Sequence, residues 1–110
     1  MDKTALISID VQLKSIQQLI QTTKFNDAIK QSKLLLIEPC EKQHQIELWY
    51  LISVAQRYAK DYTQALISIA ELLKLDEKHS RANQEQGYIN LALNQPSIAK
   101  NSFEKAVKLN

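Results

Sequence analysis

The sequence predicts an all-α fold, a right-handed α-solenoid of three antiparallel helix pairs. Three observations indicate this architecture. Apolar residues recur at three- and four-residue steps along the chain, the breaks between these segments are short, and one local pattern occurs three times. One glycine and two prolines among 110 residues also leave few of the turn residues that a multi-stranded sheet requires.

The first helix pair is predicted on either side of a break at Thr22-Thr23-Lys24. Before this break, one helix face carries Leu6, Ile9, Leu13, Ile16 and Ile20. After the break, a second helix carries Phe25, Ala28, Ile29, Ser32, Leu35 and Leu36. We expect this helix to end near Pro39, because a proline disfavours helical geometry in the residue before it.

Two further pairs follow, with helices predicted at about 44–59, 62–75 and 80–93 and a last helix beginning near Pro96. The inward or half-inward residues of the third helix are predicted to be Ile46, Trp49, Ile52, Ala55 and Tyr58. Ser80 is predicted to cap the fifth helix. Asn94 is expected in the left-handed conformation that ends a helix without glycine.

Internal similarity gives the alignment of the three pairs. Each second helix has an alanine near its start, at Ala28, Ala65 and Ala99. The last two alanines are 34 residues apart and the first two 37, and we place the surplus in a loop at 39–43. The expected organisation is one domain over 1–110, with repeats at about 9–42, 46–79 and 80–110.

This pattern resembles the tetratricopeptide repeat. The last unit carries the glycine, alanine and aromatic residue of that repeat at Gly87, Ala99 and Phe103. The middle unit carries its tryptophan at Trp49 but has Ser53 where the repeat has glycine. The first unit departs further from the pattern. The resemblance covers roughly residues 9–110 and implies a module that binds other proteins rather than an enzyme.

A narrower stretch, over 48–58 and 73–87, resembles the N-terminal repeat region of bacterial tetratricopeptide-containing sulfotransferases. In that family a catalytic domain follows the repeats. The resemblance implies a non-catalytic accessory role, as a fragment or a stand-alone relative. A reading frame that continues past Asn110 into a glycine-containing strand–loop–helix would support this alternative.

Composition argues against several other classes of function. Fourteen basic and twelve acidic residues are interspersed, so we expect neither nucleic acid nor a membrane surface as a partner. Met1-Asp2-Lys3-Thr4 lacks the layout of a signal peptide, and the single Cys40 fits a reducing compartment, so a cytoplasmic location is expected. A single glycine leaves no phosphate-binding loop, so no cofactor is predicted.

No catalytic or metal site is predicted. Cys40 and His44 have a possible ligand spacing, but two ligands are too few for a metal. His79 has no evident partner beyond Asp76, and we expect it at a helix start.

The concave face of such a solenoid is lined by the first helix of each pair. The first unit is expected to place Leu13, Lys14, Gln17, Ile20 and Gln21 there. The second and third units are expected to add Glu47, Tyr50, Leu51, Val54, Arg57, Tyr58, Arg81, Gln84, Glu85, Tyr88 and Leu91. Tyrosine and arginine dominate binding energy at interfaces, so the predicted partner contacts are Tyr50, Val54, Arg57, Tyr58, Arg81, Gln84 and Tyr88.

The sequence thus predicts a non-catalytic protein-interaction module that binds a peptide or helix in its concave groove. An adaptor for acidic chaperone C-termini is not expected, because only Arg81 fits the carboxylate clamp of such tetratricopeptide domains and Glu85 has the wrong charge. A second alternative is self-association, possible as a homodimer, because Phe103, Val107 and Leu109 are expected to form an outward apolar edge on the last helix.

Overall fold

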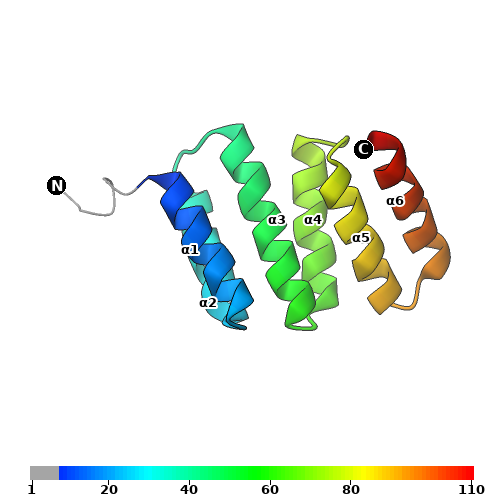
Figure 1. The fold of residues 1–110 in the computed structure, drawn as a ribbon, viewed down its shortest axis with the longest axis horizontal. Helices are drawn as coiled ribbons and strands as arrows, with labels where there is room; N and C mark the ends of the chain where they lie inside the picture. Colours follow the sequence, from blue (N-terminus) through cyan, green and yellow to red (C-terminus); the bar gives the residue numbers. More distant parts are fainter. Residues whose placement is uncertain (1–7) are drawn as a thin grey trace.

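The computed structural model describes residues 8–110, as six α-helices in a row (Figure 1). They are α1 (Ile9–Gln21), α2 (Phe25–Ile37), α3 (Lys42–Tyr58), α4 (Tyr62–Leu75), α5 (Ser80–Ala92) and α6 (Pro96–Leu109). No strand occurs between residues 8 and 110, and the predicted all-α solenoid of three helix pairs is confirmed. Leu6 and the stretch Met1-Asp2-Lys3-Thr4 lie outside the described residues.

Consecutive helices pack as pairs, α1 with α2, α3 with α4 and α5 with α6, and the pairs stack along the long axis (Figure 1). Each second helix also packs against the next first helix, α2 on α3 and α4 on α5. In addition, α1 contacts α3 and α3 contacts α5. The first helices therefore form one continuous layer, which carries the candidate groove.

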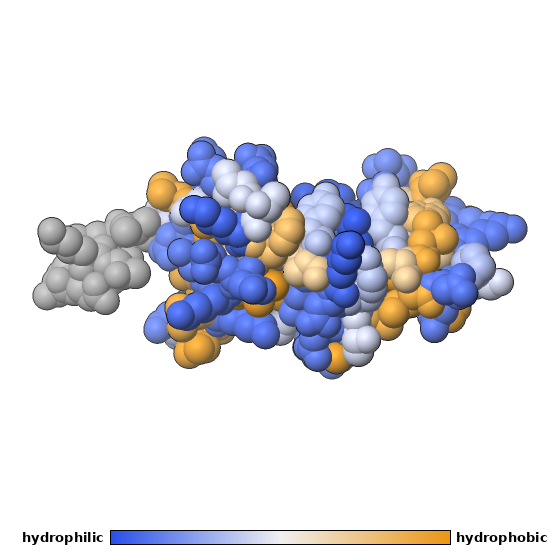
Figure 2. All heavy atoms as spheres, turned by 90° about the horizontal axis from the view of Figure 1, so that it is seen from below, coloured by the Kyte–Doolittle hydropathy of each residue, from blue (hydrophilic) through white to orange (hydrophobic). Residues whose placement is uncertain are grey.

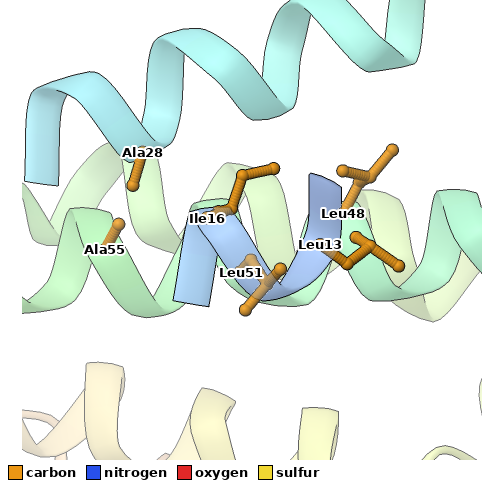
Figure 3. Packing of buried hydrophobic residues seen from close by; sticks show 6 residues of the cluster. All are labelled: Leu13, Ile16, Ala28, Leu48, Leu51 and Ala55. Atoms are coloured by element: carbon orange, nitrogen blue, oxygen red, sulfur yellow. The ribbon is translucent and has the colours of Figure 1, made fainter. Parts of the chain in front are cut away.

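The core consists of two apolar clusters that share α3. Figure 3 shows the first cluster, which joins α1, α2 and α3 through Leu13, Ile16, Ala28, Leu48, Leu51 and Ala55. The second cluster contains Ala65, Ile69, Leu72, Ala82 and Ile89. Ile46 and Trp49 of α3 pack against this second cluster. Because α3 contributes to both clusters, it connects the two ends of the solenoid.

The turn inside each pair has the same geometry. Thr23, Lys60 and Asn94 all have positive φ, at 64°, 66° and 60°. The next amide in each turn donates to a carbonyl five residues earlier, for example Asp61 N–H to Gln56 C=O at 2.9 Å. This is the Schellman motif, which terminates a helix and usually contains glycine. The left-handed conformation predicted for Asn94 is confirmed.

The third helix begins two residues earlier than predicted, at Lys42 rather than near His44. The connections before α3 and α5 are both four residues long, 38–41 and 76–79. The three surplus residues of the middle unit therefore lengthen α3 and not the loop. The extra turn places His44 Nε2 3.8 Å from the Asp10 carboxylate of α1.

One other local prediction is wrong. His79, and not Ser80, is the N-cap of α5, and its Nδ1 accepts a hydrogen bond from Ala82 N–H at 3.1 Å. The Ser80 hydroxyl instead donates to the Ala106 carbonyl of α6. Tyr58, predicted to be inward or half-inward, is 50% exposed. The Ser80 prediction failed because the imidazole of His79, one residue earlier, accepts the capping hydrogen bond.

A candidate binding groove on the first helices

A hollow of about 490 Å³ lies between the start of the solenoid and its middle pair. Its lining residues are Gln17, Ile20 and Gln21 of α1, Phe25 of α2, and Leu51, Val54 and Tyr58 of α3. Leu13, which was expected on this face, is 8% exposed and belongs to the core. The Phe25 and Tyr58 rings lie 5.8 Å apart at one edge of the hollow.

Next to this hollow, Arg57 of α3 is held by α5. Its Nη2 donates to Glu85 Oε1 at 3.2 Å, and its Nε donates to the other oxygen of the same carboxylate. The guanidinium carbon also lies 4.7 Å from the Tyr58 ring centre and 5.1 Å from that of Tyr88. Arg57 is thus clamped by a two-point ion pair and stacked against two tyrosines.

A second arginine–tyrosine contact lies further along the same two helices. Arg81 Nη2 of α5 donates to Glu47 Oε2 of α3 at 2.9 Å. Its guanidinium carbon lies 4.4 Å from the Tyr50 ring centre. The Tyr50 ring in turn lies 6.4 Å from the imidazole of His79. The fold therefore brings Glu47 and Arg81, which are 34 residues apart, into direct contact.

The remaining predicted contacts join the same surface. Gln84 Nε2 donates to the Tyr88 hydroxyl at 3.2 Å, and the Tyr88 ring meets Phe103 edge-on at 5.2 Å. Leu91 does not belong to the groove and lines a hollow at the other end of α5. Sequence reasoning placed Glu85 on this face without a role. Its contact with Arg57 could not be seen, because no local pattern relates residues 28 apart.

The pKa shifts in the groove follow from burial and from these ion pairs. Burial raises the pKa of Tyr50, aided by Glu85 and Glu47 and opposed by Arg81 and Arg57. Burial by itself lowers the pKa of Arg57, but the hydrogen bond and the charge of Glu85 outweigh it, so the pKa is raised. Burial and then Arg81 lower the pKa of His79, against the opposing charges of Asp76 and Glu47. At neutral pH the groove thus carries a charged Arg57, paired with Glu85, and a neutral His79.

The opposite end of the solenoid carries a second hollow, of about 520 Å³, along α6. Its apolar lining residues are Leu91, Pro96, Ala99, Phe103 and Val107, and its charged residues are Lys100, Glu104 and Lys108. Val107 is 75% exposed. Figure 2 shows hydrophobic surface at this end of the molecule, away from the grey residues.

The described part of the chain has neither a membrane-spanning helix nor a cluster of metal-binding side chains. No helix within residues 8–110 is long and apolar enough to cross a lipid bilayer. No group of three or more His, Cys, Asp or Glu side chains in these residues is arranged to hold a metal ion.

With this geometry established, the comparison with protein families decides the assignment. The model of the tetratricopeptide repeat matches residues 46–79 and 80–110, which is more than half of the chain. The chain belongs to the tetratricopeptide repeat family. The division of 1–110 into three repeats, with a first repeat at about 9–42, remains a prediction.

A solved tetratricopeptide-like neighbour has the same arrangement of helices. The crystal structure of PcrH in complex with the chaperone binding region of PopB superposes with a TM-score of 0.79. The two sequences are 19% identical, and the match covers 92% of this chain and 79% of that chain. At this identity the likeness concerns the fold alone. No match was found among curated proteins.

Proposed function

We propose that this tetratricopeptide domain is a non-catalytic interaction module that holds a peptide or helix of a partner protein in the groove on α1, α3 and α5. The observation that carries the proposal is the hollow of about 490 Å³ beside Val54 and Tyr58. The proposed contacts are Tyr50, Val54, Arg57, Tyr58, Arg81, Gln84 and Tyr88.

The rigidity of the exposed aromatic side chains supports this role. Tyr58 and Tyr88 are 50% and 41% exposed, yet Arg57 stacks against both rings and fixes them in place. Binding to preordered tyrosines costs little conformational entropy, which is why such residues dominate interface energies. The similarity to PcrH, which was solved with the chaperone binding region of PopB, also supports a protein partner.

The test of this proposal uses a library of random twelve-residue peptides displayed on phage and selected on the purified domain. We expect the wild-type domain to enrich a set of binding peptides. These peptides should not bind Val54→Arg, because the arginine side chain fills the hollow. The matched control is Ile67→Arg on α4, because Ile67 is 53% exposed and outside the groove. Equal binding to both variants, each shown to be folded by circular dichroism, would exclude the groove.

Mutation of Arg57 is a poor test. Removing Arg57 leaves the Glu85 carboxylate, 3% exposed, without its partner, and breaking a buried ion pair in this way costs about 3–5 kcal/mol. Loss of binding by Arg57→Ala would therefore not separate a lost contact from a lost fold. Val54→Arg leaves the ion pair untouched.

A second candidate function is self-association through the end of the solenoid. The hollow along α6 and the exposed Val107 favour it, because an apolar patch of this kind usually marks an interface. Light scattering across a concentration series would detect a dimer that dissociates on dilution and disappears in Val107→Lys. A constant mass of 12.6 kDa at every concentration would exclude it.

The accessory role beside a sulfotransferase-like catalytic domain remains a prediction from the resemblance over 48–58 and 73–87. These segments form much of α3 and the start of α5, so the same groove would then position a partner or substrate for the neighbouring domain. The reading frame beyond Asn110 is the test of this alternative.

A further inference from the structure

Among residues 8–110, no charged side chain lines the hollow between α1 and α3. Of its seven lining residues, four are apolar, two are glutamines and one is Tyr58. The glutamine amides can form hydrogen bonds with the backbone of a bound segment. The apolar side chains can bury one apolar side chain of that segment. This chemistry suits an uncharged peptide with an aliphatic or aromatic anchor.

Arg57, the arginine that neighbours this hollow, is already neutralised. Arg57 neighbours the hollow residue Tyr58, and both oxygens of the Glu85 carboxylate accept hydrogen bonds from it. Glu85 is 3% exposed, so the pair lies in a low-dielectric environment where its attraction is strong. An incoming carboxylate would have to displace Glu85 or lie beside it, and like charges repel strongly in such a place.

The second arginine of the groove is paired in the same manner. Arg81 is bound by Glu47, and its flat face is covered by Tyr50. This pair is more accessible, since the side chains of Arg81 and Glu47 are 54% and 24% exposed. Removing the Glu47 charge would therefore free an accessible arginine without leaving a charge buried.

We infer that Glu85 and Glu47 set the specificity of the groove. By neutralising Arg57 and Arg81 they remove the two arginines of the groove as anchors for carboxylates, and the occupant is an extended peptide segment without acidic residues that inserts one apolar side chain beside Val54. This inference rests on the proposed function, because it names the class of partner for the same groove.

The experiment uses three pools of biotinylated twelve-residue peptides, randomised except for a central pair fixed as Leu-Leu, Glu-Glu or Lys-Lys. We expect the wild-type domain to retain the leucine pool at least about tenfold better than either charged pool, since a buried aliphatic side chain alone accounts for such a factor. Glu47→Gln should raise retention of the Glu-Glu pool several-fold. Glu85→Gln should also raise retention of the Glu-Glu pool. If Glu85→Gln does not fold, Glu47→Gln alone provides the test.

The matched control is Glu71→Gln, which removes the 3.0 Å ion pair to Lys74 on α4 and should leave all pools unchanged. The wild-type domain could instead prefer a charged pool and lose that preference in Val54→Arg. This result would overturn the inference but support the groove as the binding site. Unchanged retention of the Glu-Glu pool by Glu47→Gln would also overturn it. If the wild-type domain retains none of the three pools better than Val54→Arg does, the proposed function is overturned as well.

Discussion

Gly87 of α5 faces the ring of Phe103 on α6. A Cβ at position 87 would lie 2.5–2.7 Å from three ring atoms of Phe103, well inside van der Waals contact. At the equivalent positions of the preceding repeat the chain has Ser53 and the smaller Ile69. The single glycine of the chain is therefore explained by the aromatic ring that faces it.

This contact predicts a compensating pair of substitutions. Gly87→Ala should lower the free energy of unfolding, because overpacking of about 1–3 kcal/mol exceeds the roughly 1 kcal/mol that alanine gains as a helix former. Phe103→Ile in the Gly87→Ala background should recover part of that loss. Urea denaturation of the two single variants and the double variant measures the coupling. A more stable Gly87→Ala would show that the ring moves aside without cost.

His79 predicts a pH dependence of stability. Its Nδ1 accepts the Ala82 N–H, and burial lowers its pKa from the ordinary value of 6.5, so the folded state favours the neutral ring. The unfolded chain then binds the proton more readily, and stability should fall as the pH drops below 6.5. The charged groups facing this ring are Arg81, Asp76 and Glu47.

Urea midpoints between pH 7.5 and pH 5.0 would measure this loss. The control is His79→Asn, which keeps an N-cap acceptor but does not titrate, and its midpoint should depend less on pH over the same range. Identical pH profiles for the two proteins would contradict the assignment of the effect to His79.

The three hairpin turns have the same geometry, but the residue with positive φ differs in each: Thr23, Lys60 and Asn94. Thr23 and Lys60 adopt the left-handed conformation that glycine and asparagine tolerate best. Lys60→Gly should therefore raise the free energy of unfolding by about 0.5–1 kcal/mol, and Asn94→Gly should raise it less. Thermal and urea unfolding of both variants measures the difference. A destabilised Lys60→Gly would mean that the entropy of glycine in the unfolded chain outweighs the relief of strain.

The boundaries of the elements could be predicted wherever local chemistry sets them. α4 begins at Tyr62 and ends at Leu75 as expected, because the Lys60-Asp61 turn and the Asp76 break lie next to it. The extra turn of α3 was missed. Lys42 and Gln43 fit a loop and a helix equally well, and the contact of His44 with Asp10 on another helix is invisible in the local sequence.

Because α3 packs in both core clusters, we expect substitutions in its buried face to destabilise the whole molecule most. Leu48 is fully buried between α1, α2 and α3, so Leu48→Ala should cost about 2–5 kcal/mol and lower stability in a single transition. Leu34, which is 55% exposed on α2, is the matched control and should change stability by less than about 0.5 kcal/mol. Two separate unfolding transitions in Leu48→Ala would show that the pairs fold independently.

The helices between residues 8 and 110, their order and the alignment of the second and third repeats could all be predicted from the sequence. These features follow from apolar periodicity and turn residues, which act over a few positions of the chain. The sequence also indicated which helices carry the groove, because a repeat places equivalent residues on one face.

The contacts among the residues of the candidate groove could not be predicted from the sequence. The pairing of Arg57 with Glu85 and of Arg81 with Glu47 joins residues about 30 positions apart, and stacking of the pairs alone brings them together. The same stacking leaves Tyr58 half-exposed and buries Leu13. The physical reason is that charge pairing and burial depend on the packing distance between helices, whereas a sequence pattern records only which face of its own helix a residue occupies.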